Sequence, residues 1–227
     1  MREDKEKATS LRKKGFSYNQ IRQKLGIPKS TLSYWLRDLH ISEKSRGKIL
    51  ARAHRLSIEG LMRRNKNQTK LANERATAIR KEAKGECLKL MEDRLFMIGL
   101  SLYWAEGYKK GANGSKWKSI SFANSDPAMI RIMMKFFRKF LGITDSKIKI
   151  QLIAHKNINI DEAVIFWSDL TKISKEQFIK SFNGVNKSSK GKRNPNSLTH
   201  GTVHIRINDV KLFFRLIGWI DGLKGKI

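Results

Sequence analysis

A glutamate at the end of an apolar run is the residue of this sequence whose position most suggests chemistry. Residues 95–105 read LFMIGLSLYWA, and Glu106 and Gly107 follow directly. This pattern predicts a buried helix whose last turn contains Glu106. A carboxylate there faces the negative end of the helix dipole, at a cost of about 0.3–1 kcal/mol. Glu106 is therefore either a functional acid that something else holds in place, or an exposed residue in a C-terminal turn.

Other reactive side chains form no recognisable site in the sequence. His200 and His204 are four residues apart in a predicted strand, but no Cys pair accompanies them, so we do not expect zinc. Cys87 stands alone in a basic stretch without a base to activate it, and we expect it to be inert. The sequence contains no P-loop and no Gly-rich dinucleotide fingerprint, so it does not indicate a nucleotide cofactor.

The charge of the chain indicates a polyanionic partner. The 227 residues include 48 Lys and Arg against 20 Asp and Glu, which gives a formal net charge of +28. Nucleic acid is the usual partner of such a protein, an anionic membrane surface is the rival, and a basic protein that merely coats nucleic acid is a third alternative. The N-terminal residues MREDKEKATS have no apolar segment, and no stretch reaches the ~18 apolar residues of a membrane span. With a single Cys, these features favour a soluble cytoplasmic protein, associated with the nucleoid and not with a membrane.

Residues 1–40 form the first predicted domain, which is all-α. Helical patterns cover KEKATSLRKKG, SYNQIRQKLG and STLSYWLRDL, with Ser17 as an N-cap and the tight turn GIPKS between the last two. Two short helices joined by a Gly-containing turn describe a helix-turn-helix. Its predicted core consists of Ile21, Leu25, Ile27, Leu32 and Leu36.

The segment GFSYNQIRQKLGIPKSTLSYWLR closely resembles the helix-turn-helix of resolvases and transposases. The resemblance implies that the third helix enters the major groove of double-stranded DNA and touches base edges and phosphates. Trp35 is expected to pack inside, whereas for Tyr34 both packing and DNA contact stay open. The DNA-binding residues expected in this domain are Ser17, Tyr18, Lys29, Ser30, Thr31, Ser33, Tyr34 and Arg37.

Residues 41–90 form a basic segment between two domains. They contain 14 Lys and Arg against five Glu, and no Pro. Apolar residues fade between Arg63 and Lys70, which argues against a sustained heptad and a coiled coil. We predict a long, mostly solvated basic helix, weakened at its three glycines, that could follow a DNA backbone. A flexible basic linker is the alternative.

Residues 91–227 form the second predicted domain. Strand-like alternation occurs in KSISFANS, SKIKIQLIAH and GTVHIRIN, and residues 107–115 leave room for one more short strand. Helical patterns occur in the run that ends at Glu106, and in DPAMIRIMMKFFRKFLG, DEAVIFWSDLTKI, SKEQFIKSF and DVKLFFRLIGWIDGLKG. Together with the N-terminal helices, this succession predicts an α+β fold with a small, mainly antiparallel sheet and flanking helices.

Residues 99–107, GLSLYWAEG, resemble the LAGLIDADG signature of a family of homing endonucleases. The positions that match in type are Leu102, Ala105, Glu106 and Gly107, and those that depart from it are Gly99, Ser101 and Trp104. The strand that follows and the helix opened by SDP are also similar to the LAGLIDADG domain, so the resemblance covers residues 91–227.

The resemblance implies a homodimer, because each chain supplies one signature helix. Two such helices would approach closely through Ser101 and Ala105, small residues on one helical face. Their C-terminal acids would then converge, so that Glu106 and the carbonyl of Gly107 could hold Mg²⁺ for phosphodiester hydrolysis. A similar LIGWIDG near the C-terminus precedes no sheet, and we interpret its Asp221 as an ordinary helix-terminal residue. The DNA contacts expected from the sheet are Lys118, Lys147, Lys149, Gln151 and Arg206.

Two functions agree with these features. The first is a sequence-specific, homodimeric, Mg²⁺-dependent DNA endonuclease with Glu106 as its catalytic residue. The second is a DNA-binding transcriptional regulator that does not cut, similar to a bacterial sporulation-regulator family that pairs such a domain with a helix-turn-helix in the opposite order. Retention of Glu106 favours cleavage, whereas Trp104 and the lack of a clear basic catalytic partner favour binding alone.

Overall fold

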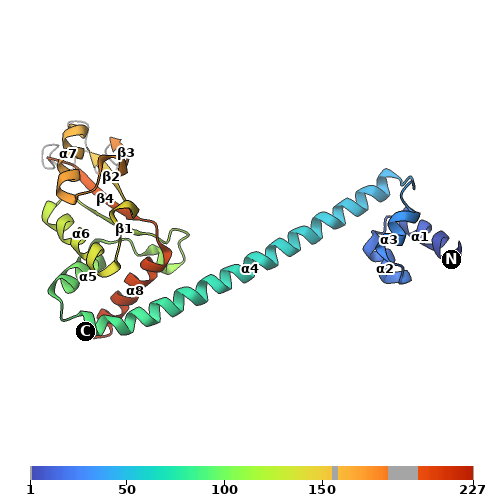
Figure 1. Ribbon diagram of the computed structural model, residues 1–227, viewed down its shortest axis with the longest axis horizontal. Coiled ribbons are helices and arrows are strands. Elements are labelled where there is room, and N and C mark those ends of the chain that lie inside the picture. The colour runs from blue at the N-terminus through green and yellow to red at the C-terminus, as the bar shows by residue number, and fades with distance from the viewer. Residues whose placement is uncertain (1, 155–157, 184–198, 227) are drawn as a thin grey trace. The chain divides into compact units, whose positions relative to one another are not determined.

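The structure, a computed structural model, describes residues 2–154, 158–183 and 199–226. The chain divides into two compact units, Met1–Ala72 and Asn73–Ile227. Their boundary falls within one long helix, α4 (Glu43–Leu90), so each unit contains one end of it (Figure 1). The strands that the structure describes all lie in the second unit, and the fold is mixed α+β, as the sequence predicts.

The first unit is built from α1 (Arg2–Lys13), α2 (Tyr18–Leu25), α3 (Lys29–Trp35) and the beginning of α4. Ser17 caps α2, because its hydroxyl accepts from the backbone N–H of Gln20 and the Gln20 side chain accepts from the N–H of Ser17. The helix ends at Gly26, whose φ of 72° favours glycine. The core consists of Ala8, Ile21, Leu32 and Leu36, with Leu25, Ile27 and Trp35 packed against it. The predicted core residues therefore lie together, and Trp35 packs as expected.

α3 is shorter than its sequence pattern predicts. The pattern runs to Leu39, but the helix ends at Trp35 and Leu36 is its C-cap. The N–H of Leu39 then donates to the carbonyl of Leu36 at 3.3 Å, and both leucines contact the core. Because the chain turns inward there, Arg37 lies in the turn after α3 and not on the helix, which corrects its predicted position.

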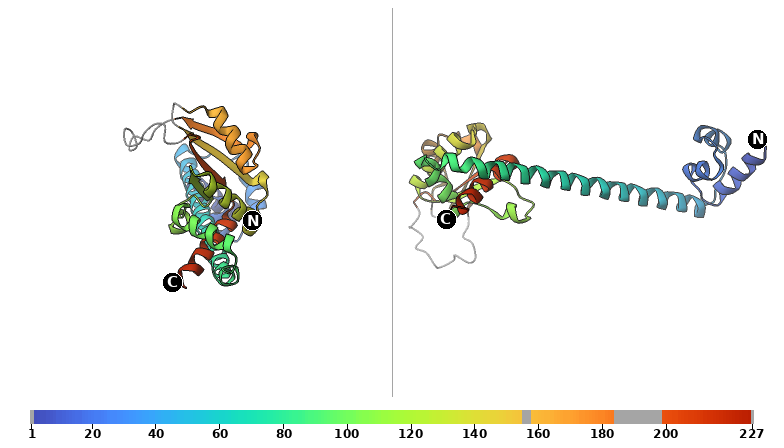
Figure 2. Two further views of the ribbon diagram at one scale, coloured as in Figure 1. Left: turned by 90° about the vertical axis from the view of Figure 1, so that its left-hand side faces the viewer. Right: turned by 90° about the horizontal axis from the view of Figure 1, so that it is seen from below.

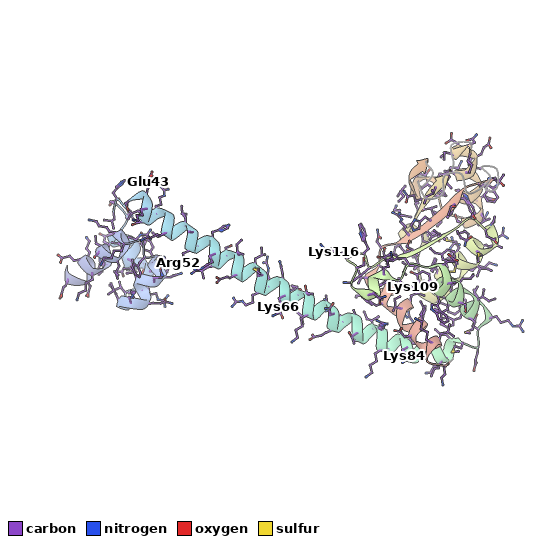
Figure 3. All side chains as sticks on the ribbon, turned by 180° about the vertical axis from the view of Figure 1, so that it is seen from behind. Glu43, Arg52, Lys66, Lys84, Lys109 and Lys116 are labelled. Carbon is purple, nitrogen blue, oxygen red and sulfur yellow. The ribbon has the colours of Figure 1, made fainter. Side chains whose placement is uncertain are left out.

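The first turns of α4 belong to the helical unit. Arg52 donates to Oε1 of Gln20 at 2.6 Å and to the carbonyl of Gly15 at 3.1 Å. Ser45 Oγ donates to the carbonyl of Lys13 at 2.5 Å. By contrast, every residue from 61 to 70 is exposed, and Figure 3 shows the side chains of this stretch, Lys66 among them, projecting from the ribbon. The middle of α4 is thus the solvated basic helix that the sequence predicts.

The last turns of α4 are part of the second unit, which corrects their interpretation as solvated linker. Ala83 and Cys87 are buried against α8 (Val210–Lys224), which lies beside them (Figure 2). Two glycines of α8 permit this approach: an added Cβ at Gly218 would lie 2.4 Å from the Arg80 carbonyl, and one at Gly222 would lie 2.6 Å from Cβ of Cys87. Apolar residues at a helical spacing in residues 76–87 therefore mark a packed face.

Polar pairs flank this helix contact on the two sides of the buried residues. Asp221 accepts hydrogen bonds from the guanidinium of Arg80 through both carboxylate oxygens, one of them at 3.1 Å. Glu86 accepts from Arg215 at 3.1 Å and from the indole N–H of Trp219 at 3.1 Å. Asp221 thus serves as an ion-pair partner in the last helix.

The sheet has four strands in the order β1-β4-β2-β3. Its strands are β1 (Ile120–Asn124), β2 (Ile148–Ala154), β3 (Phe178–Asn183) and β4 (Thr202–Ile207). β4 pairs antiparallel with β1 and β2, whereas β3 pairs parallel with β2. One face is apolar, with Ile120, Phe122, Ile150 and Ile205 fully buried. The predicted small, mainly antiparallel sheet is confirmed.

β3 is a strand where the sequence pattern predicts a helix over residues 174–182. Only a short 3₁₀ turn, Lys175–Gln177, precedes it. The side-chain amide of Gln177 donates to the carbonyls of Asp145 at 2.6 Å and Ile148 at 2.8 Å, which holds this segment at the start of β2. Pairing with the edge of the sheet thus overrides a weak local helical signal. The further short strand considered for residues 107–115 is a 3₁₀ turn, Lys110–Asn113, although the N–H of Tyr108 donates to the carbonyl of Ser121 at 2.9 Å.

Helices cover the apolar face of the sheet. They are α5 (Arg94–Glu106), α6 (Pro127–Leu141), α7 (Ile160–Thr171) and α8, and they contribute Phe96, Tyr103, Phe136, Phe137, Trp167 and Trp219 to the core. Gly99 is required where α5 meets α6, since an added Cβ would lie 2.4 Å from Cγ of Phe136. Asp126 caps α6 by accepting from the N–H groups of Ala128 and Met129. These helices leave the opposite face of the sheet available for a ligand.

Candidate nucleic-acid interface

The open face of the sheet carries polar and basic side chains in two rows. Arg206 of β4 is paired in register with Ser121 of β1 and with Lys149 of β2. His204 is paired with Ala123 and with Gln151 in the same way. All six residues are half-buried or exposed, while their neighbours in each strand are buried, except Asn124 at the end of β1. This alternation follows from the pleat, which sends successive side chains to opposite faces.

A hollow of about 440 Å³ lies over one end of these rows. It is lined by Tyr108, Trp117, Ser119, Ser121, Lys149, Ile179, His204, Arg206 and Asn208. The structure therefore brings together two of the five basic or amide contacts predicted for the sheet, Lys149 and Arg206, and places Gln151 in the adjacent row. Lys118 and Lys147 do not line the hollow: Lys118 is half-buried before β1, and Lys147 is exposed in the turn before β2.

Trp117 is a residue of this hollow that sequence reasoning missed. Its side chain is 75% exposed although it sits on a fixed loop. The hydroxyl of Tyr108 donates to Ser115 Oγ at 3.0 Å and lies 3.4 Å from the Trp117 carbonyl. Gly111 passes beneath, since an added Cβ would lie 2.4 Å from that same carbonyl. The aromatic ring between Lys116 and Lys118 was the signal in the sequence, because basic residues around an exposed ring suit a nucleic acid.

His204 is another residue of the hollow for which the sequence predicts no functional role. Its Nε2 is hydrogen-bonded to Ser121 Oγ, and its Nδ1 lies 3.2 Å from a terminal nitrogen of Arg206. Burial, together with the charge of Arg206, lowers the pKa of His204. His200 is not on the same strand face: it precedes β4 and stacks on Phe166 with ring centroids 3.9 Å apart. The two histidines therefore do not form a pair of metal ligands.

The outer face of α3 presents most of the residues of the first unit that are predicted to contact DNA. Lys29, Ser30 and Ser33 are exposed, and Tyr34 is 75% exposed, which leaves it available for contact. Thr31 is half-buried beside them. A helix with short polar side chains on one face can enter the major groove.

Ser17 and Tyr18, at the start of α2, are less free than α3. Ser17 uses its hydroxyl to cap α2, with a further hydrogen bond to Oε1 of Gln20 at 3.2 Å. The ring of Tyr18 lies 4.3 Å from the guanidinium of Arg12 and is half-buried. Both side chains therefore make contacts that stabilise the first unit.

Glu106 is the last residue of α5, as the sequence predicts, and its side chain is exposed. Gly107 follows as the C-cap, and its N–H donates to the carbonyl of Tyr103 at 2.8 Å. The buried hydroxyl of Tyr103 donates to the carbonyl of Tyr108 at 2.9 Å, and burial raises the pKa of that phenol. Nζ of Lys109 donates to the carbonyl of Gly107 at 2.7 Å. The pKa of Lys109 is lowered, because the effect of burial exceeds the opposite effect of the nearby carboxylate of Glu106.

The oxygen ligands that one chain supplies at this helix end fit Mg²⁺ poorly. Among the residues that the structure describes, no group of three or more His, Cys, Asp or Glu side chains gathers to hold a metal. Glu106 supplies one carboxylate, and the ammonium of Lys109 already binds the Gly107 carbonyl. Mg²⁺ prefers six oxygen ligands, commonly one or two carboxylates with phosphates and waters. A metal would need a second carboxylate from another copy, or a displaced Lys109.

The predicted dimer residues lie on an exposed face of α5. Ser101 and Ala105 are exposed, and Ile98, one turn earlier, is 49% exposed. Gly99 and Tyr103 point instead into the core of the unit. A small-residue face beside Glu106 therefore stands open for a close helix contact.

None of the helices in the described ranges is both long and apolar enough to cross a membrane. Comparison with protein-family models, with curated protein sequences and with solved structures finds no match to this chain.

Proposed function

We propose that this protein binds double-stranded DNA at a specific sequence, with the open face of its sheet and the outer face of α3 as contact surfaces. The observation that carries the proposal is the placement of Arg206 and Lys149 at one register position of adjacent strands, on a polar face whose reverse side is the core. The major groove admits antiparallel strands as well as helices, and Arg to guanine is the commonest specific contact there.

The charge of the chain supports a long contact with phosphates. The net charge is +28, and the exposed stretch of α4 contributes Arg63, Arg64, Lys66 and Lys70. Such contacts supply affinity that depends steeply on salt and carries no sequence information. Specificity must therefore come from the sheet and from α3.

The resemblance of residues 15–37 to the helix-turn-helix of resolvases and transposases supports α3 as the second contact surface. A homodimer is part of the proposal, because Ser101 and Ala105 leave one face of α5 open to a second copy. A protein of this kind would be associated with the nucleoid.

Selection from a pool of random duplexes tests the proposal. The full-length protein should enrich one sequence, and Arg206→Ala should reduce its preference for that sequence by about 1–3 kcal/mol. Arg131→Ala is the control, since Arg131 is an exposed arginine on α6, which covers the other side of the sheet. Failure to enrich any duplex, or equal losses in the two variants, would contradict the proposal.

DNA cleavage is the second candidate function. It is favoured by the exposed carboxylate of Glu106 directly beside the open face of α5, where a second copy would bring another carboxylate. The bond from Lys109 to the Gly107 carbonyl favours instead a regulator that binds without cutting. The nuclease and regulator hypotheses differ only in whether this helix end binds a metal and cuts the DNA.

A cleavage assay on the selected duplex separates these readings. With Mg²⁺ present, a nuclease should cut the duplex, and Glu106→Gln should reduce cutting by orders of magnitude while DNA affinity stays near wild type. In a regulator, neither protein cuts, and Glu106→Gln leaves affinity and its dependence on Mg²⁺ unchanged. Glu92→Gln provides the control, because Glu92 is also exposed but precedes α5.

A further inference from the structure

Three side chains form a hydrogen-bonded chain on the open face of the sheet. Ser121 of β1 is bonded to Nε2 of His204, and Nδ1 of His204 is bonded to Arg206 at 3.2 Å. His204 and Arg206 are two residues apart on β4, so both stand on the same face. The imidazole therefore links the residue best suited to read a base to a fixed hydroxyl on the neighbouring strand.

The partners of His204 define its protonation state. A guanidinium has only N–H donors, so Nδ1 of His204 must accept, and the proton of the neutral ring is then on Nε2. That proton can be donated to Ser121 Oγ. Among the described residues around the ring, the charged groups are Arg206 on β4 and Lys149 on β2, and β1 and the loop contribute Ser121 and the phenol of Tyr108. No carboxylate in this group would favour an imidazolium.

We propose that His204 is a positioning residue that orients the guanidinium of Arg206 toward a guanine in the DNA site, and that it does so only while its ring is neutral. The inference rests on the proposed function. It adds that the sheet recognises a guanine and that His204 controls this recognition. Arg206 needs two N–H groups for O6 and N7 of guanine, and its bond to His204 uses only one nitrogen. Holding the planar fork in one orientation lowers the entropy lost on binding.

Protonation of His204 breaks its hydrogen bond with Arg206, so the guanidinium is no longer held in one orientation. The protonated ring has a donor at Nδ1, so it can no longer accept from Arg206, and two like charges then face each other. Because burial and Arg206 lower the pKa of His204 below its ordinary value of 6.5, the ring is neutral at pH 7 and charges only in more acidic solution. Selection for guanine should therefore fall as the pH falls, while affinity for arbitrary duplexes is kept or increased by the added charge.

Base substitution in the selected duplex tests the inference. Each guanine is replaced in turn by 7-deazaguanine, which lacks the N7 acceptor, and the ratio of the two dissociation constants is measured at a series of pH values from 7.5 downwards, as far as protein and duplex stay folded. For wild type at pH 7.5, one guanine should show a ratio of about tenfold. Arg206→Ala and His204→Ala should both reduce the ratio to near one. His204→Asn can place Oδ1 near the position of Nδ1, so it should keep the ratio over this whole pH range, whereas wild type should lose the ratio as His204 becomes protonated.

The outcomes separate the inference from the function beneath it. A wild type that enriches no duplex from the random pool overturns both. A wild type that selects a site but shows the same 7-deazaguanine ratio as His204→Ala, or the same pH profile as His204→Asn, overturns the inference alone. Thermal unfolding of each variant is measured alongside. If His204→Ala does not fold, the pH profile of His204→Asn against wild type decides.

Discussion

Lys109 donates a hydrogen bond from Nζ to the carbonyl oxygen of Gly107 at 2.7 Å, next to the carboxylate of Glu106. The ammonium of Lys109 thus binds the Gly107 carbonyl, which is one of the two oxygen ligands on which the predicted metal site depends. Lys109 thereby places a cation at the C-terminal end of α5, which relieves part of the electrostatic cost of placing Glu106 there.

Replacement of Lys109 by Met should increase the affinity of this helix end for a metal ion. The change frees the Gly107 carbonyl and removes a positive charge that repels the ion. A titration with Tb³⁺, followed by its luminescence, should show binding several-fold tighter than in wild type. Lys110→Met is the control, because Lys110 is a neighbouring exposed lysine. If adding Glu106→Gln to Lys109→Met does not remove the gain, the metal is bound elsewhere.

Ser101→Arg should prevent dimer formation on DNA. Ser101 is exposed on the face of α5 proposed to meet a second copy, and a long charged side chain cannot enter a close helix contact. Light scattering of the complex should give two chains per duplex for wild type and one for the variant. Ser146→Arg adds the same charge at an exposed turn and should remain dimeric. A Ser101→Arg complex that still holds two chains would place the dimer contact on another surface.

Gly99→Ala should destabilise the second unit by about 1–3 kcal/mol, because the added methyl would overlap the ring of Phe136. Gly60→Ala is the contrasting control: nothing lies within 4 Å of a Cβ at that helical position, so it should stabilise by up to about 1 kcal/mol. Urea unfolding measures both changes. Equal effects would mean that α5 and α6 are less closely packed than described.

Trp117→Ala should weaken DNA binding by about tenfold, if the exposed ring stacks on a base or lies along the backbone. Trp117→Phe should recover most of the affinity, since stacking requires only an aromatic face. Fluorescence anisotropy of the labelled duplex measures both variants. Wild-type affinity in Trp117→Ala would restrict the contact surface to the strands.

Lys29→Ala and Arg37→Ala should differ in kind. Lys29 is at the start of α3, where a side chain can reach a base edge, so its loss should cost about 1–3 kcal/mol on the selected sequence only. Arg37 lies in the turn after the helix, which favours a phosphate contact. Its loss should weaken binding to every duplex and should reduce the slope of log affinity against log salt concentration by about one. Salt titrations on specific and random duplexes distinguish the two.

Local signals were sufficient to predict much of this fold. The N-cap at Ser17, the Asp126–Pro127 helix start and the alternation in residues 148–154 each act within a few residues, so they can be read from the sequence. The same holds for the end of α5 at Glu106, which depends only on the glycine that follows it.

Contacts between distant segments could not be predicted in this way. β3 forms because residues 178–183 meet the edge of β2, and the last turns of α4 are buried because Gly218 and Gly222 lie against them. The bond between His204 and Arg206 depends on which face of β4 turns away from the core, and its anchor, Ser121, is 83 residues earlier in the chain. Periodicity identifies a face, but it does not identify what covers that face.

The contact of α8 with the end of α4 also determines when the two units can fold during synthesis. The first unit needs only residues 1–72, and its contacts are local. In the second, Ala83 and Cys87 meet their glycine partners only after residues 218 and 222 have left the ribosome. The N-terminal helical unit can thus fold while the rest of the chain is still being made, and the sheet domain closes last.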